Sequence, residues 1–586
     1  MQILKIKEFW KKEKTNLIIL FLIIIVASIF RLYNFEEWFH FRNDQARDAI
    51  MASRVLDGGL ENLRLLGPKA GGSALHLGPI FYYFQAFSCW IFQSKEPPIM
   101  AIPDLLFSIA IIPLLYFFIR NLFSNKTSLS ITAIYAFSYV AIQYSRFAWN
   151  PNSLPFWSLL LVFSIYKVAV LKNREKAGWF LILAGFSYAV ASQLHFVALA
   201  GLPIFIFIFW LKYLPKKINW KFWLGSILAV FVLYIPVLAS EIITDGNNSK
   251  QFIHTVENRG KEKKDKTIFE KITKTTENYG KYYSFFLTSI NDNEVESIYS
   301  IGKVFIFGSI IFLFLVWKKK FIKVNSKKKK LLYYLFFAFF LGSLIISYKL
   351  SHEINKPRYW FAQAIIPFIF FGFFLESLFN SKRRCLTRLG WSLVFIIIAL
   401  NLSAVINIFL NFSNREDGEN FGRITTSTTN RYNRIVPLSD MRRVVDYIYE
   451  QNSTGQKVCL SSPSGYGASY QYLFQLKYPE LEVVRNDSYF SDQMRKNCNI
   501  FLINIKEKTK EKQQDILHMD FKTKNSFRAG VIRVYDIEPL ENDLSDEYRI
   551  EFEAEKKIDQ IEKLEEEPDN EVETIPMKVW ADFFNR

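Results

Sequence analysis

The residues with the clearest capacity for chemistry lie in the segment 34–83, where the chain reads FRNDQARDA around Asp44. Asp44 stands just before a stretch with helical spacing, Ala46–Leu56, and a short distance beyond a long apolar run. A carboxylate is the usual general base when an attacking hydroxyl or amine must lose its proton. Asn43 and Asp44 are also good N-cap residues, so capping of this helix is the competing interpretation.

Other polar side chains extend this candidate site. Asp48 and Arg47 lie within a turn of Asp44, where they line the site or pair with each other on a solvated face. The remaining candidates flank later apolar blocks, and the alternative for each is an ordinary interface or packing residue. They are Arg358, Tyr359, His352, Arg146, His195 and His76.

Membrane-spanning helices are predicted to position these residues. Half of the 586 residues are apolar, yet the mean hydropathy is only +0.09, so the apolar residues must be concentrated in blocks. Blocks of roughly 20 residues cross the hydrocarbon core of a bilayer, and about eleven are present. The expected spans are 17–33, 99–119, 129–145, 154–171, 177–192, 196–212, 220–240, 301–317, 331–348, 359–379 and 388–410. The predicted fold class is therefore an α-helical polytopic membrane protein, whose first span is not cleaved.

Basic residues orient this bundle. Lys and Arg are enriched in cytoplasmic loops, and a cytoplasmic N-terminus puts nearly all short basic connections on that side, among them KNREK and the run 318–330. The loop 241–300 is basic but is placed outside, since long loops orient a chain weakly. The stretch 84–92 is interpreted as an interfacial helix, because counting it as a span would reverse every later loop. Attraction to an anionic inner leaflet then explains much of the net charge of +18, and no nucleic-acid partner is predicted.

Three regions are expected along the chain. They are a transmembrane domain at 1–411 with the outer first loop 34–98, a small extracytoplasmic α/β domain at 412–540, and an acidic tail at 541–586. In the second region, SDMRRVVDYIYE has helical spacing, while QKVCLSS, LEVVRN and NIFLINI have the composition of strands. Cys459 and Cys498 either pair in an oxidising compartment or remain two buried thiols. No Cys/His cluster has the spacing of metal ligands.

Several motifs, in order along the chain, resemble a known family. NDQARDA, LLGP and HLGPIFYY lie in the first outer loop, SRFAWNPNSLPFW at 145–157, and HEINKPRYWFAQAIIP at 352–367. Together they are similar to glycosyltransferase family 39, the group of protein O-mannosyltransferases and lipid A aminoarabinose transferases with the GT-C membrane fold. The resemblance covers roughly residues 31–380.

The resemblance implies an inverting transfer of a sugar, a hexose or pentose, at the outer face of the membrane. An acceptor (a lipid, glycan or protein) attacks C1 of a polyprenyl-phosphate sugar that enters from the membrane lipids, and the lipid phosphate leaves. Asp44 matches the family's catalytic first-loop Asp, the expected base. Arg358 matches the Arg of the family's Pro-Arg-Tyr segment and is expected to bind the leaving phosphate.

Two departures from the family pattern limit what is carried over. Asn150 stands where several relatives have a second acidic residue, so no required metal or other cofactor is predicted. The first-loop motif has Asp-Gln in place of the Asp-Glu of the protein mannosyltransferases, which weakens the case for a protein acceptor. The alternative function is a transporter or flippase of lipid-linked glycans, which should carry charges at mid-membrane depth. The predicted spans are almost free of charge, so the transferase is favoured.

Overall fold

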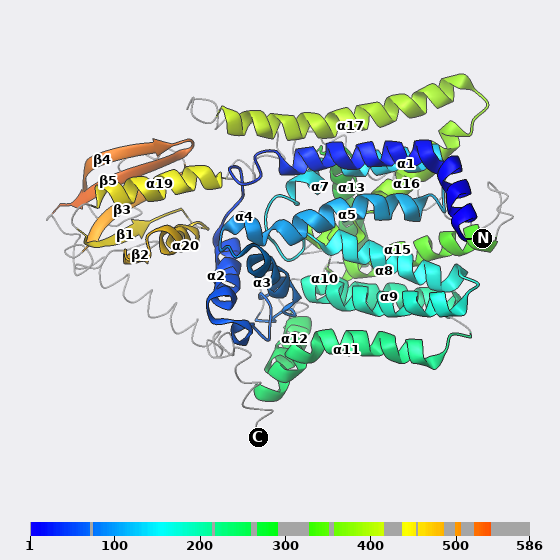
Figure 1. Cartoon of the computed structure of the whole chain (residues 1–586), viewed down its shortest axis with the longest axis horizontal. Coiled ribbons are helices and arrows are strands. Elements are labelled where there is room, and N and C mark those ends of the chain that lie inside the picture. The colour runs from blue at the N-terminus through cyan, green and yellow to red at the C-terminus, as the bar shows by residue number, and fades with distance from the viewer. Residues whose placement is uncertain are drawn as a thin grey trace.

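The computed structural model describes residues 2–70, 74–213, 217–258, 267–290, 327–350, 357–414, 436–452, 455–463, 465–485, 498–505 and 521–540. The chain is mostly helical and carries a small sheet domain near its C-terminus, as the sequence predicts (Figure 1). The first helices are α1 (Gln2–Leu32), α2 (Asn43–Gly58), η1 (Leu60–Asn62), α3 (Ile80–Phe92), α4 (Pro97–Met100), α5 (Ile102–Ile119), α6 (Asn125–Ala136), α7 (Tyr139–Gln143), α8 (Leu154–Val170), α9 (Arg174–Leu194), α10 (Phe196–Tyr213) and α11 (Trp220–Ile243). They are followed by α12 (Asn247–Asn258), α13 (Ile268–Thr288), α15 (Lys327–Leu350), η2 (Pro357–Gln363), α16 (Ile366–Phe379) and α17 (Arg384–Ser413).

Among the described residues, 7 helices are long and apolar enough to cross a membrane, namely α1, α5, α9, α10, α11, α15 and α17. The pair η2 and α16 passes the same test together but bends by 57°. α8 and α3 are shorter apolar helices. These elements confirm a multi-pass helical membrane protein, although the predicted total of about eleven spans is not confirmed. The predicted span 301–317 lies outside the described residues.

The span predicted at 129–145 is wrong as a single helix. α6 ends at Ala136, and α7 begins only at Tyr139. Other helices satisfy the polar groups at the break, since the Tyr139 N–H donates to Oδ1 of Asn401 (2.9 Å) and Ser138 Oγ donates to the Phe286 carbonyl (2.9 Å). Membrane helices tolerate such breaks when neighbours pair with the freed groups. An apolar run carries no information about those neighbours.

The predicted long outer loop 241–300 also differs from the structure, because it contains α12 and α13. The C-terminal half of α13 packs into the bundle, where Tyr279 and Tyr283 are buried. The Tyr279 ring meets the ring of Trp360 edge-on, with centroids 4.7 Å apart. Lys, Glu and Thr fill the first half of α13 and its buried residues are largely Tyr and Phe, so a hydropathy pattern does not reveal it.

The sheet domain consists of α19 (Leu438–Gln451), α20 (Gly467–Lys477), β1 (Lys457–Ser461), β2 (Val483–Arg485), β3 (Cys498–Asn504), β4 (Phe521–Ala529) and β5 (Ile532–Pro539). Its strand order is β2-β1-β3-β5-β4, with β1 parallel to β2 and β3, and β5 antiparallel to β3 and β4. The helix predicted from SDMRRVVDYIYE and the three predicted strands are confirmed as α19, β1, β2 and β3. The sequence did not reveal the β4–β5 hairpin, because the middle of β4 is polar and exposed.

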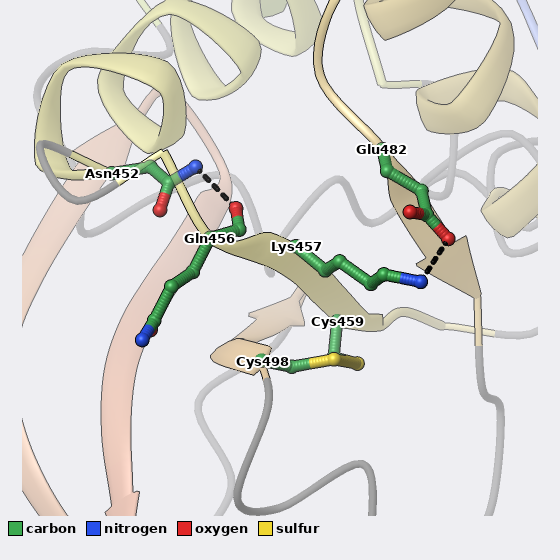
Figure 2. The surroundings of a disulfide bond; sticks show 6 residues. All are labelled: Asn452, Gln456, Lys457, Cys459, Glu482 and Cys498. Atoms are coloured by element: carbon green, nitrogen blue, oxygen red, sulfur yellow. Dashed lines mark hydrogen bonds and ion pairs between the residues drawn. A yellow bond between two sulfur atoms is a disulfide. The ribbon is translucent and has the colours of Figure 1, made fainter.

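A disulfide joins two neighbouring strands of this sheet. Figure 2 shows Cys459 on β1 bonded to Cys498 at the start of β3, with their Cα atoms 5.6 Å apart. Beside it, Nζ of Lys457 contacts a carboxylate oxygen of Glu482 at 2.6 Å. Of the two alternatives left open by the sequence, the structure contains the disulfide.

The two ends of the helix bundle differ. Figure 1 shows α2 and the sheet domain at one end of the bundle and the N-terminus at the other. The connections from α1 to α2, from α7 to α8 and from α9 to α10 all reach the first of these ends. The candidate site residues are concentrated there.

Candidate active site

A cavity of about 200 Å³ lies at this end of the bundle and is lined by several separate segments of the chain. Its lining includes the predicted residues Asp44, Arg47, His195, Arg358 and Tyr359. The other lining residues are Pro68, Lys69, Ala70, Leu77, Trp149, Asn150, Pro151 and Phe196. Residues more than 300 positions apart in the sequence are thus brought together.

Asp44 occupies the first turn of α2. Arg42 holds the N-cap position of this helix, and its backbone N–H donates to Oε1 of Gln45 at 3.2 Å. The Asp44 side chain is 57% exposed and lies 3.8 Å from Nη1 of Arg47. Asp44 is therefore not the N-cap residue, and its carboxylate is open to a group that enters the cavity.

Arg47 is held in place by Asp48. The Arg47 Nε and Nη2 atoms donate to Oδ1 of Asp48 at 2.9 and 2.7 Å, and the Asp48 side chain is fully buried. Burial raises the pKa of Asp48 to about 6, while attraction to Arg47 acts in the opposite direction. Asp48 lies behind Arg47 rather than in the cavity lining, where it orients the arginine.

The loop that precedes α3 brings Lys69 to the cavity wall. The Gly67 N–H donates to the Leu77 carbonyl at 2.8 Å, so the loop folds back on itself. His76 supports this turn and does not line the cavity: its Nδ1 lies 2.8 Å from the Gly67 carbonyl oxygen. The His76 backbone N–H also donates to Oδ1 of Asn248 in α12 at 2.7 Å, which ties the loop to the helix after α11.

The turn between α7 and α8 forms another wall. In the middle of this connection, the Trp149 N–H donates to Oδ2 of Asp104, a buried residue in the first turn of α5 (3.0 Å). In the next residue, Nδ2 of Asn150 donates to the Leu194 carbonyl at 2.6 Å. Two contacts to neighbouring helices therefore fix this turn.

Aromatic rings support Arg358. Its guanidinium carbon lies 5.2 Å from the ring centroid of Trp149 and 5.3 Å from that of Tyr359, both within the range of cation–π attraction. The His195 ring meets the Tyr359 ring edge-on at 5.4 Å. Arg358 lies at the start of η2, on the side away from the bend into α16, so the side chain stands at the end of the bundle.

Two predicted site residues remain. Arg146 is buried outside the cavity lining, where Nη1 donates to the Arg31 carbonyl (2.8 Å) and Nη2 to the Asn34 carbonyl (3.2 Å). It therefore satisfies carbonyl groups at the C-terminal end of α1. His352 lies outside the described residues. In the part of the chain that the structure describes, no three His, Cys, Asp or Glu side chains are grouped as metal ligands.

The cavity combines one solvent-accessible carboxylate with the cationic side chains Arg47, Lys69 and Arg358. Cations bind phosphate groups and offset negative charge that develops on a leaving oxygen, and a carboxylate accepts a proton from an attacking group. Fold and site together define a multi-pass membrane protein with a candidate group-transfer site at one end of its helices.

Comparison with known proteins supports this description. Residues 76–239 match the family model described as Dolichyl-phosphate-mannose-protein mannosyltransferase, which confirms the resemblance to membrane glycosyltransferases. Asn150 and His195 lie within the matched segment, whereas Asp44 and Arg358 lie outside it. No curated protein sequence matches the chain.

Solved membrane structures show a distant likeness. ArnT from Cupriavidus metallidurans in the apo state is 10% identical, with a TM-score of 0.42, over 88% of this chain and 97% of that chain. Archaeal AglB from Archaeoglobus fulgidus, in complex with an inhibitory peptide and a dolichol-phosphate, is 11% identical with a TM-score of 0.46, over 84% and 70%. The S. cerevisiae protein O-mannosyltransferase Pmt1-Pmt2 complex bound to the sugar donor is 14% identical with a TM-score of 0.30, over 40% and 34%.

Sequence reasoning missed Lys69 and Asp104. Lys69 directly follows the LLGP motif, and a basic residue beside a quoted motif was the available signal. Asp104 lies inside a predicted span, where an acidic residue is itself a functional signal.

Proposed function

We propose that this protein is a membrane glycosyltransferase that moves a sugar from a polyprenyl-phosphate donor to an acceptor on the outer face of the membrane. The observation that carries the proposal is the meeting of Asp44 with Arg47, Lys69 and Arg358 in one cavity. The similarity of residues 76–239 to a mannosyltransferase family supports the proposal, because that segment includes Asn150 and His195, which line the cavity.

In the proposed reaction, an oxygen or nitrogen of the acceptor forms a bond to C1 of the sugar while Asp44 takes its proton. The bond between C1 and the phosphate oxygen breaks, and its electron pair leaves with the polyprenyl phosphate. Attack from the side opposite the phosphate inverts the configuration at C1. Arg358 and Lys69 bind the phosphate and offset the added charge.

The proposal places the N-terminus in the cytoplasm and the cavity and sheet domain outside. The Cys459–Cys498 disulfide supports this orientation, because disulfides persist in oxidising compartments. The connection between α8 and α9 is basic, which is typical of a cytoplasmic loop. The other ends of both helices adjoin the cavity at Pro151 and His195, which supports a cavity on the outer side. The division into domains near residue 411 belongs to the same proposal, and α17 ends close to it, at Ser413.

A transporter is less well supported. Three buried or partly buried charged residues of the helices bind helix ends or a turn between helices rather than line a path through the bundle. Arg31 donates to the carbonyl of Ala136 at 2.9 Å. Asp104 accepts the Trp149 N–H, and Glu376 accepts the N–H of Ser124 at 3.1 Å.

The test uses purified full-length protein in lipid vesicles with a panel of polyprenyl-phosphate sugars and candidate acceptors. We expect one donor to release polyprenyl phosphate only when an acceptor is present, and the Asp44→Asn protein to release it roughly 10²–10⁴-fold more slowly. Movement of the intact donor across the vesicle membrane, without sugar transfer, would instead establish the transporter.

A further inference from the structure

The start of α2 is held by the sheet domain, through the residue next to Asp44. The Asn43 backbone N–H donates to the Gly465 carbonyl at 2.9 Å. In return, Oδ1 of Asn43 accepts the backbone N–H of Ala468, in the first turn of α20, at 3.0 Å. A side chain and a main-chain group of one residue therefore bind the turn that connects β1 to α20.

Arg42 completes this contact. Its guanidinium carbon lies 5.1 Å from the ring centroid of Tyr466, within cation–π range. Gly465 adopts φ +95°, and a Cβ there would overlap the Arg42 guanidinium group. The positive φ favours glycine in this turn, and the absence of a side chain leaves room for the Arg42 guanidinium group.

α20 forms hydrogen bonds with the first outer loop at two further points. Tyr472 OH lies 2.7 Å from Ser53 Oγ, nearly three turns further along α2 than Asn43. The same hydroxyl donates to the Lys95 carbonyl at 2.6 Å, near the end of the loop. Because α2 is fixed at both its first turn and its middle, it cannot slide or rotate without breaking contacts to the sheet domain.

We infer that Asn43 is a positioning residue through which the sheet domain sets the place of the Asp44 carboxylate in the cavity. This inference rests on the proposed function, in which Asp44 is the base. Asp44 has few constraints of its own, since its side chain is 57% exposed and its described ion-pair partner, Arg47, lies 3.8 Å away. The position of its carboxylate therefore depends on the backbone at the start of α2, which the Asn43 contacts define.

A contact that served only to attach the sheet domain would not involve the residues at the start of α2. Arg442 of α19 makes such a contact, because it binds Glu36 (3.0 Å) and Glu96 in the first outer loop, away from the start of α2. Arg442→Ala is therefore the matched control, since it weakens the same domain contact without touching residues 42–44.

The test compares steady-state transfer by purified full-length wild type, Asn43→Ala, Asn43→Asp and Arg442→Ala, with Asp44→Asn in parallel. In Asn43→Ala we expect kcat to fall by about 10- to 100-fold, the effect of a small misplacement of a reacting group, with the KM for the donor nearly unchanged. Asn43→Asp keeps an acceptor oxygen of the same reach for the Ala468 N–H, so we expect it to restore most of kcat. Arg442→Ala should keep a kcat close to wild type.

The possible outcomes distinguish the positioning role of Asn43 from the role of Asp44 as the base. If Asn43→Ala keeps kcat within about twofold of wild type, or loses no more than Arg442→Ala does, the positioning role is wrong. Failure of Asn43→Asp to recover activity would overturn it as well. If Asp44→Asn transfers sugar at the wild-type rate, the proposed base is wrong, independently of the Asn43 results.

Discussion

Asp44→Asn tests the proposed role of this residue as the base. Asn has the size of Asp, and Asp44 is an exposed first-turn residue rather than the N-cap, so helix α2 and the fold should be kept. Asn cannot accept the proton, so the initial transfer rate at saturating donor should fall by roughly 10²–10⁴-fold, the usual contribution of a general base. Donor binding should survive, because the base faces the acceptor. A rate close to wild type would move the catalytic carboxylate elsewhere.

Arg358→Ala should affect the donor rather than the fold. Arg358 is partly exposed at the bundle end and rests on Trp149 and Tyr359, so its loss leaves no buried cavity. Loss of a charged hydrogen-bond partner costs about 1.5–3 kcal/mol, equivalent to a roughly 10- to 150-fold weaker donor interaction. Titration of the donor against initial rate measures this, with Arg358→Lys as the charge-preserving control. Unchanged donor affinity and turnover in Arg358→Ala would remove Arg358 from the site.

The raised pKa of Asp48 leads us to expect that the transfer rate depends on pH. Its pKa is raised from 3.8 to about 6, so the Asp48 carboxylate loses its charge, and Arg47 loses its anionic partner, as the pH falls through about 6. We expect the wild-type rate to fall over that range and Asp48→Asn to lack the inflection, in pH–rate profiles measured between about pH 5 and 8.

The stability of the protein should respond to Asp48 in the opposite direction. The folded state binds more protons than the unfolded state between pH 3.8 and about 6. The contribution of this group to the free energy of unfolding therefore increases as the pH falls through that window. Thermal unfolding at each pH is the control: a rate that falls together with stability would indicate acid unfolding and contradict the role of Asp48.

Part of the site could be predicted at the level of single residues. Asp44, Arg47, His195, Arg358 and Tyr359 line the cavity because each flanks an apolar block, which fixes its depth in the bundle. Arg146 occurs in a similar sequence setting, yet it binds carbonyl groups of α1. Whether a polar residue at a helix end faces the cavity or a neighbouring helix depends on the rotation of that helix, which loop charge and hydropathy do not specify.

Among the elements, the α7–α8 turn offers a further test. Asp104 binds its Trp149 N–H, and Trp149 in turn supports Arg358. Asp104→Ala leaves this N–H without its acceptor and should displace both side chains, so we expect the KM for the donor to rise by about tenfold, the effect of about 1.4 kcal/mol. Asp104→Asn keeps an acceptor oxygen and should stay near wild type. Equal losses in both variants would show that the charge, and not the hydrogen bond, matters.

Helix prediction succeeded where one apolar block forms one helix, as in α9, α10 and α11. It failed where helices interrupt one another. The break between α6 and α7 depends on Asn401 and Phe286, more than a hundred residues away. The buried half of α13 similarly depends on packing partners such as Trp360. Long-range partners of this kind leave no trace in a local hydropathy pattern.

For the whole molecule, the proposed orientation predicts which positions a membrane-impermeant thiol reagent can reach. Single cysteines at Leu60, Lys524 and Lys172 are exposed test positions, in a background in which Cys89 and Cys385 are replaced. In intact cells we expect labelling at 60 and 524 and none at 172, which should react only after the membrane is opened. Labelling of 172 and 524 from the same side would refute the proposed topology.

The contact between α2 and α20 has a consequence for biosynthesis. Asn43 and Ala468 are separated by 425 residues, yet a hydrogen bond joins them. At about 5–20 residues per second, a ribosome needs roughly 20–85 seconds to make the intervening chain. During that time the segment around α2 is already translated but lacks its partner, so under the proposed positioning role of Asn43 we expect transfer activity only after the sheet domain has folded onto α2. In a chain whose translation is delayed, the surface of α2 that contacts α20 stays uncovered for longer, and we expect it to be more accessible to chaperones and proteases.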